Sequence, residues 1–168
     1  MKAMIHVQHL LGSGSAVRAA GLAAALAEVG VETVLATGAR LPPFVREGLY
    51  EIVDLPYARA KTATVSTIVD DRGAPIDEAW MKRRRTRLLA LFDEFDPDVL
   101  VVETWPFGHR FFDAELDALL EHASNRVPRP LVVCSLRDVV RVDEGADGAV
   151  VDRVRRFFDS VLVNGDPD

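Results

Sequence analysis

Hydrophobic positions fall alternately into short apolar runs and helical stripes along the whole chain. The first run extends from Met4 to Leu11, is interrupted by a few polar positions, and leads into a Gly-Ser-Gly-Ser turn at residues 12–15. Beyond this turn, small and apolar residues recur at spacings of three and four, which predicts a helix that ends before Gly30. The chain therefore opens with a strand, a glycine turn and a helix, and we expect Ser13 or Ser15 to cap that helix.

The same alternation continues to the end of the chain. Further apolar or β-branched runs predict strands at residues 31–37, 50–55, 98–103, 131–136 and 160–163. Helical stripes lie between them, at residues 77–95, 112–123 and 150–158. This order predicts an α/β fold, a doubly wound and mostly parallel sheet of about six or seven strands with helices on both faces. A length of 168 residues is typical of one domain, so we expect residues 1–168 to form one.

Ligands of such sheets bind outside the carboxyl ends of the strands, near the point where the strand order reverses. Three polar clusters directly follow predicted strands, at residues 12–18, 103–110 and 137–138. The glycine turn presents backbone N–H groups at the positive end of a helix dipole, which favours a phosphate or another anion. Residues 57–75 lack periodicity, which is typical of a lid, a binding loop or a disordered segment.

Composition narrows the partners and the compartment. A formal net charge of −6 argues against a general nucleic-acid binder, whose surface is basic. The single Cys134 excludes an intrachain disulfide, and its apolar surroundings predict a buried thiol in a reducing compartment. No run approaches the roughly 20 apolar residues that cross a bilayer, and the N-terminus lacks the features of a signal peptide. These observations together predict a cytoplasmic protein.

The glycine turn is a weak signal, since it serves equally as a tight connection between strand and helix. It departs from the dinucleotide fingerprint because Val17 occupies the third glycine position and Thr37 to Arg40 follow the second strand without an acidic residue. No Gly-Lys-Ser/Thr follows, which excludes a P-loop. We therefore expect no cofactor. We also expect no metal site, because the adjacent Asp70 and Asp71 are typical of a turn.

Five segments taken in order carry a resemblance over essentially the whole chain: VQHLLGSGSAVRAA, VDDRGAPIDEAWMKRRRTRLLALFD, PDVLVVETWPFGHR, VCSLRD and FFDSVLVNGDPD. They resemble the N-terminal domain of predicted glycosyltransferases related to MurG, the transferase that completes the lipid-linked peptidoglycan precursor. The resemblance implies a GT-B fold, in which two Rossmann-like domains face a cleft. It implies that this chain is the acceptor-binding half and is inactive alone. Its partners would be a nucleotide sugar, bound mainly by an absent C-terminal domain, and an unidentified acceptor that receives a hexose.

One position departs from the family pattern, which has a histidine directly after the glycine turn. This chain has Ser15 there, and a serine hydroxyl binds phosphate but is a poor base at neutral pH. Arg18 matches the basic position one helical turn further on. Either another residue acts as the base, or this chain has lost or changed its activity.

Glu103 and His9 are the two candidate catalytic bases. Glu103 ends an apolar strand, where burial can raise the pKa of a carboxyl group. Its structural alternative is an ion pair with His109 or Arg110. His9 lies at the end of the first apolar run and could polarise an acceptor hydroxyl, or it could be a histidine of the core or the sheet edge.

Further candidates for acceptor or phosphate binding follow the same strands: Gly12, Ser13, Gly14, Ser15, Arg18, Trp105, Phe107, His109, Arg110, Arg137 and Asp138. Trp105 and Phe107 could stack on a sugar or an apolar acceptor, or pack against a neighbouring helix. The basic run at residues 82–87 predicts a solvated helix face. Its alternatives are contact with an anionic acceptor or peripheral contact with an anionic membrane surface.

Two other functions stay open from the sequence. One is a non-catalytic module that binds an anion or a nucleotide. The other, less favoured, is an NADP-dependent oxidoreductase domain, for which Arg40 would suit the cofactor's extra phosphate. The sugar, the acceptor, the stereochemistry of transfer and the oligomeric state are not determined by the sequence.

Overall fold

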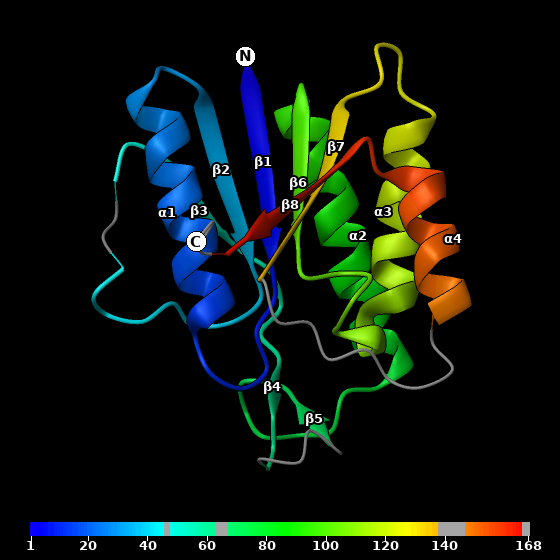
Figure 1. The fold of residues 1–168 in the computed structure, drawn as a ribbon. Coiled ribbons are helices and arrows are strands. Elements are labelled where there is room, and N and C mark those ends of the chain that lie inside the picture. Colours follow the sequence, from blue (N-terminus) through cyan, green and yellow to red (C-terminus); the bar gives the residue numbers. More distant parts are fainter. Residues whose placement is uncertain (46–47, 63–66, 138–146, 166–168) are drawn as a thin grey trace.

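The computed structural model describes residues 1–45, 48–62, 67–137 and 147–165 of the chain. Its main sheet has six strands in the order β3-β2-β1-β6-β7-β8, and every neighbouring pair runs parallel (Figure 1). The strands are β1 Lys2–Val7, β2 Glu32–Thr37, β3 Glu51–Asp54, β6 Val99–Glu103, β7 Leu131–Arg137 and β8 Ser160–Asn164. This arrangement confirms the predicted α/β fold, and its strand order is that of a Rossmann-like domain.

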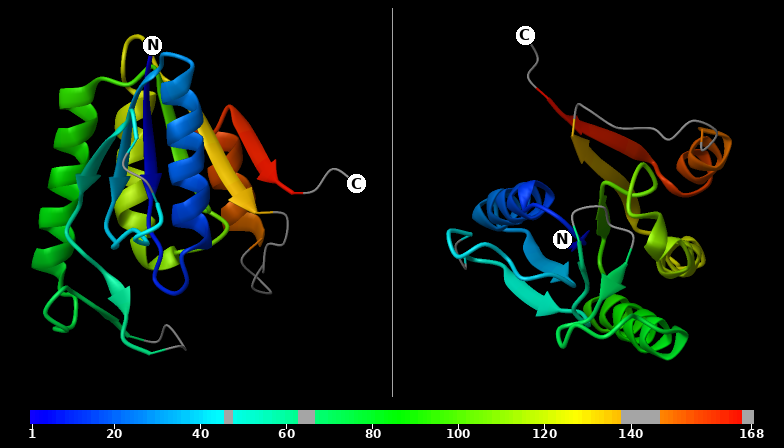
Figure 2. Two further views of the ribbon diagram at one scale, coloured as in Figure 1. Left: turned by 90° about the vertical axis from the view of Figure 1, so that its left-hand side faces the viewer. Right: turned by 90° about the horizontal axis from the view of Figure 1, so that it is seen from below.

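Helices cover both faces of the sheet, as the sequence predicts (Figure 2). One face carries α1 Gly14–Glu28, and the other carries α2 Glu78–Phe95, α3 Asp113–Ser124 and α4 Asp147–Phe157. A short 3-10 helix, η1 Arg110–Phe112, leads into α3. Side chains of β1 divide between the two cores, with Ile5 and Val7 packed toward α1 and Met4 toward α2 and α3. A continuous apolar strand is buried on both faces in this way.

The ends of α2 follow from local chemistry. The Asp77 carboxylate caps the first turn by accepting the N–H of Trp80 at 2.7 Å. Asp96 takes a left-handed conformation with φ 51° directly after the last turn and before Pro97. Both helix ends confirm the prediction from the sequence.

At the start of the chain the bounds of the first strand need correction, whereas the predicted N-cap position is confirmed. The first strand ends at Val7 and not at Leu11, because the Gln8 side chain turns inward and donates to the carbonyls of His9 and Ala58. Ser13 occupies the N-cap of α1, but its hydroxyl makes no capping hydrogen bond. The first turn of α1 is closed by the backbone alone, with the N–H of Val17 bonded to the Ser13 carbonyl at 2.9 Å.

The strand order reverses between β1 and β6, so the chain's functional crevice is expected at the carboxyl ends of these two strands. We call this side the carboxyl edge; it is the lower side in Figure 1. A two-stranded antiparallel hairpin, β4 Arg59–Ala60 and β5 Ile68–Val69, lies at this edge. It falls within the aperiodic stretch, whose turn is formed by Asp70 accepting the N–H groups of Arg72 and Ala74.

The tight packing at Gly38, directly after β2, gives a first prediction. A Cβ atom at Gly38 would overlap the Arg84 guanidinium and the Gln8 amide oxygen, both of which are buried. We expect Gly38→Ala to lower the free energy of unfolding by about 1–3 kcal/mol or more, because the overpacked site must shift buried polar groups. Urea denaturation measures the change.

Gly21 supplies the matched control, since it lies in the interior of α1 and a Cβ there meets nothing within 4 Å. We expect Gly21→Ala to raise stability by about 0.5–1 kcal/mol through helix propensity. Equal and small effects of the two substitutions would contradict the packing described at Gly38.

Candidate functional site

The wall of the candidate site is residues 55–60, here called the edge segment, which follows β3 across the carboxyl edge. Three backbone hydrogen bonds join it to the ends of the first two strands. The N–H of Leu55 donates to the Thr37 carbonyl and that of Ala58 to the Gly38 carbonyl, both at 2.8 Å. The N–H of Ala60 donates to the Leu10 carbonyl at 3.2 Å. The buried Gln8 side chain adds a bond from its Nε2 to the Ala58 carbonyl at 3.1 Å. The edge segment is therefore fixed to the sheet and forms a wall over the ends of β1 and β2.

A wholly buried arginine of α2, Arg84, holds this wall in place. The Nη1 atom of Arg84 donates to the Pro56 carbonyl at 2.8 Å, and its Nε lies 3.0 and 2.9 Å from the two carboxylate oxygens of Glu115. The guanidinium also lies 4.7 Å from the ring centre of Phe112 and 5.7 Å from that of Trp80. One side chain thus joins α2, α3 and the edge segment.

Arg84 corrects the expectation that the basic run forms only a solvated face. It lies four residues after Trp80 and four before Leu88, so it falls on the inward stripe of α2. Lys82 and Arg83 are exposed, as predicted for that run. Glu115 makes the burial of Arg84 tolerable by neutralising its charge.

His6 of β1 lies beside this ion pair, on the face of the sheet that α2 and α3 cover. Its Nε2 is 3.8 Å from the Glu115 carboxylate, and neither ring nitrogen has a hydrogen-bond partner among the described residues. Burial, and then the positive charge of Arg84, lower the pKa of His6 to about 3. The imidazole is therefore neutral at physiological pH.

A cavity of about 380 Å³ opens at the carboxyl edge between the glycine turn and the edge segment. We call it the edge cavity, and its lining is His9, Leu10, Leu11, Gly12, Ser13, Ala39, Tyr57, Arg59 and Ala60. It brings together three residues that the sequence singles out, namely His9, Gly12 and Ser13. Gly12 has a φ of 71°, which favours glycine and sets the direction of the turn.

Two histidines from neighbouring strands lie near each other here. His9 is half-buried, its Nδ1 has no hydrogen-bond partner among the described residues, and burial lowers its pKa. His109 comes from the loop after β6, with a φ of 59°. Burial, and then the proximity of His9, lower the pKa of His109 to about 4. Both imidazoles are neutral at pH 7, and a neutral imidazole can accept a proton.

Glu103 ends β6 and is paired with an unexpected partner. Its buried carboxylate accepts a hydrogen bond from the Nη2 of Arg18, on α1. The partners expected from the sequence were His109 and Arg110. The Arg18 side chain is 28% exposed, so its guanidinium reaches from the buried carboxylate toward solvent. This ion pair ties the first turns of α1 to the end of β6, across the point where the strand order reverses.

Trp105 corrects the expectation of stacking on a ligand. Its ring is wholly buried, packs 6.2 Å from the ring of Phe158, and donates its indole N–H to Asp113 at 2.8 Å. The packing alternative is therefore the correct one. Cys134 is buried as predicted, donates to the Trp105 carbonyl at 3.3 Å, and has a pKa raised to about 12, chiefly by burial.

The other predicted residues that the structure describes lie near the carboxyl edge without lining the edge cavity. Phe107 is half-buried, and Arg110 is exposed with its Nε 3.9 Å from Asp113. Arg137 is exposed at the end of β7, and Asp138 lies outside the described residues. The remaining two, Gly14 and Ser15, form the first turn of α1.

Several residues of the site are not singled out by the sequence. Tyr57 and Arg59 line the edge cavity, and the Arg40 guanidinium lies 6.0 Å from the centre of the Tyr57 ring. The unusual length of the aperiodic stretch was the signal that could have located Tyr57 and Arg59. Arg84 could have been placed on the buried face of α2 from its helical spacing to Trp80. The role of Glu115 is recognised only from its contact with Arg84 in the structure.

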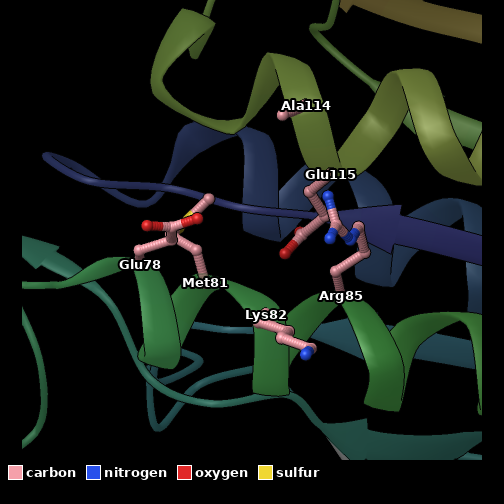
Figure 3. Close-up of a pocket in the computed structure, with 6 residues that line it drawn as sticks. All are labelled: Glu78, Met81, Lys82, Arg85, Ala114 and Glu115. Atoms are coloured by element: carbon pink, nitrogen blue, oxygen red, sulfur yellow. The ribbon is translucent and has the colours of Figure 1, made fainter.

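A second hollow, of about 270 Å³, lies between α2 and α3 (Figure 3). Its lining is Glu78, Met81, Lys82, Arg85, Ala114 and Glu115. Figure 3 shows Glu115 and Arg85 pointing toward each other across it. The Glu115 carboxylate already serves Arg84, so we place the candidate site at the edge cavity.

Two kinds of feature are absent from the described residues. In that part of the chain, no group of three or more His, Cys, Asp or Glu side chains could hold a metal ion. Within the same residues, no helix is long and apolar enough to cross a membrane.

Comparison with known proteins gives a likeness of fold. No family model and no curated protein matches the chain. The crystal structure of SsfS6, a glycosyltransferase of Streptomyces sp. SF2575, superposes with a TM-score of 0.50 and 16% sequence identity. The match covers 81% of this chain and 39% of that one, so this chain spans well under half of its neighbour's length. At this identity the likeness establishes the Rossmann-like fold.

The burial of His6 predicts how stability depends on pH. The unfolded chain binds a proton at His6 below pH 6.5, whereas the folded chain binds it only near pH 3. Stability should therefore fall as the pH drops below 6.5, by up to about 1.4 kcal/mol per pH unit from this residue. His6→Leu removes the group, and urea denaturation from pH 7 to pH 4 compares the two slopes. Parallel slopes in the two proteins would show that His6 is not buried in its neutral form.

Proposed function

We propose that this chain is the acceptor-binding half of a two-domain GT-B glycosyltransferase related to MurG, and that the enzyme transfers a hexose from a nucleotide-diphosphate sugar to an acceptor hydroxyl. One observation carries the proposal: a neutral imidazole, His9, lines a cavity beside a glycine turn at the carboxyl edge of a Rossmann-like sheet. The shared fold with a Streptomyces glycosyltransferase supports it. The MurG relationship rests on the sequence resemblance.

His9 is the residue best suited to act as the base. In the proposed step the acceptor oxygen forms a bond to the anomeric carbon of the sugar, and the bond from that carbon to the diphosphate breaks. The proton of the acceptor hydroxyl passes to His9, and the nucleoside diphosphate departs with the bonding electrons. Burial lowers the pKa of His9, which keeps the imidazole neutral and ready to accept that proton.

Arg18 and Glu103 are assigned a supporting role. Glu103 is occupied by its ion pair with Arg18, so we assign it to holding that arginine and not to proton transfer. Arg18 and the backbone N–H groups at the start of α1 would then face the negative charge that develops on the leaving diphosphate. A fixed cation is more effective there than a mobile one, because it needs no reorganisation during the reaction.

The donor would be bound mainly by a second lobe. The neighbour's chain extends far beyond the matched portion, which is compatible with such a lobe. Closure of the two lobes over the edge cavity would exclude water and so prevent hydrolysis of the donor. The exposed Lys82 and Arg83 would suit an anionic membrane surface if the acceptor is lipid-linked.

The test uses the protein that carries this domain together with the proposed donor lobe. A thermal-shift screen with nucleotide sugars identifies the donor, since a ligand at about 100 times its Kd stabilises by about 2.7 kcal/mol. Release of nucleoside diphosphate then reports transfer to candidate acceptors. We expect His9→Gln to lower kcat by about 100-fold or more, with the donor-induced shift unchanged.

His122→Gln is the matched control, because His122 is a half-exposed histidine near the end of α3, hydrogen-bonded to Asp93. It should leave kcat unchanged. The proposal fails if no nucleotide sugar stabilises the protein at saturation, or if His9→Gln retains the full rate. Stabilisation by nucleotides without any transfer would instead indicate a non-catalytic binding module. Saturable binding of NADPH at micromolar concentration would indicate an oxidoreductase domain.

A further inference from the structure

The lining of the edge cavity also indicates the class of acceptor. Resting on the function proposed above, we propose that the acceptor is a planar, largely apolar hydroxylated molecule that carries a negatively charged group. Three features of the cavity support this, namely its apolar lining, an arginine that has no ion-pair partner among the described residues, and the placement of these groups relative to His9.

About half of the lining of the edge cavity is apolar and offers no side-chain partner to a polar acceptor. Leu10 and Leu11 from the loop after β1, Ala39 from the loop after β2 and Ala60 from β4 contribute apolar surface, and Tyr57 contributes an aromatic ring. A sugar acceptor has several hydroxyl groups, and those facing these walls would lose water without gaining hydrogen bonds. A flat apolar body would bury its carbon surface against the same walls at no such cost.

Arg59 supplies the charge. It is exposed on β4 at the edge cavity, and no carboxylate among the described residues lies within ion-pair distance of it. Arg18 and Arg84, by contrast, are each paired with a buried glutamate. The guanidinium of Arg59 is therefore available to an anionic ligand, and its planar fork suits a carboxylate or a phosphate.

The placement of these groups orients the ligand. His9 enters the edge cavity from the loop after β1, whereas Tyr57 and Arg59 enter from the edge segment and β4. The Arg40 guanidinium lies against the Tyr57 ring, which favours a fixed flat surface. A planar molecule on this surface can present its hydroxyl to His9 and its anionic group to Arg59. We therefore assign Arg59 the role of selecting an anionic acceptor, and Tyr57 the role of providing the flat surface on which the acceptor lies.

The experiment measures binding to the 168-residue chain by fluorescence titration, without any donor. The probe is 6-hydroxy-2-naphthoate, 2-naphthol is its uncharged counterpart, and maltose is the polar competitor. We expect the naphthoate to bind about tenfold more tightly than naphthol, the size of effect that one charge-assisted hydrogen bond gives. Arg59→Gln should abolish that difference, and Tyr57→Leu should weaken both aromatic probes.

Arg72→Gln is the matched control, because Arg72 is an exposed arginine of the same stretch that does not line the edge cavity. It should bind both probes as the unchanged chain does. Equal affinities for naphthoate and naphthol, an unchanged difference in Arg59→Gln, or displacement of the naphthoate by maltose would each overturn the inference.

These outcomes are separable from those for the proposed function. If the naphthoate binds as expected but no nucleotide sugar registers, the transferase proposal fails and the ligand chemistry of the edge cavity stands. If a nucleotide sugar registers and transfer occurs while the naphthoate shows no preference over naphthol, this inference alone is wrong.

Discussion

The buried ion pair between Arg84 and Glu115 is the interaction on which the carboxyl edge depends. Burying two charges costs free energy, which good geometry and further hydrogen bonds must offset. Here the guanidinium contacts both carboxylate oxygens, donates to the Pro56 carbonyl and lies against two aromatic rings. The absence of a side chain at Gly38 leaves room for it. The wall of the edge cavity is thereby fixed to the helices behind the sheet, and not only to the loops beside it.

A second ion pair acts on the opposite face of the sheet. Glu103 at the end of β6 holds Arg18 of α1, so the glycine turn is fixed relative to the strand on the far side of the order reversal. His9 and His109, which follow β1 and β6, are kept neutral by burial. In the function proposed above, a neutral imidazole at His9 can accept the proton of an acceptor hydroxyl directly. Glu103 and Glu115 therefore influence the candidate site indirectly, by fixing the positions of Arg18 and Arg84.

The fold was predictable because its signals are local and periodic. Apolar runs located all six strands of the sheet, and the Asp77 cap together with Pro97 located both ends of α2. Residues that line the edge cavity were singled out by the sequence only where they lie on the turn between a strand and a helix, as for His9 and Ser13. A solvated face was favoured for the basic run as a whole, because the sequence does not show that Glu115, a residue of another helix, neutralises Arg84. The Trp105 position was ambiguous for the same reason, since its indole partner lies on a later element. Residues 57–60 carry no periodicity at all, so their place in the wall depends wholly on tertiary hydrogen bonds.

The most direct test of this account is amide hydrogen exchange at Ala58 and Ala60, whose N–H groups bond the edge segment to the loops after β2 and β1. The variant is Arg84→Met combined with Glu115→Gln, which leaves no unpaired charge in the core, and Arg83→Met on the exposed face of α2 is the control. If the ion pair holds the wall, exchange at Ala58 and Ala60 will accelerate by about tenfold or more beyond any change at the amides of β1 and β6, because the edge segment opens locally. Exchange that rises only in step with the central strands, or that does not change, would contradict the account.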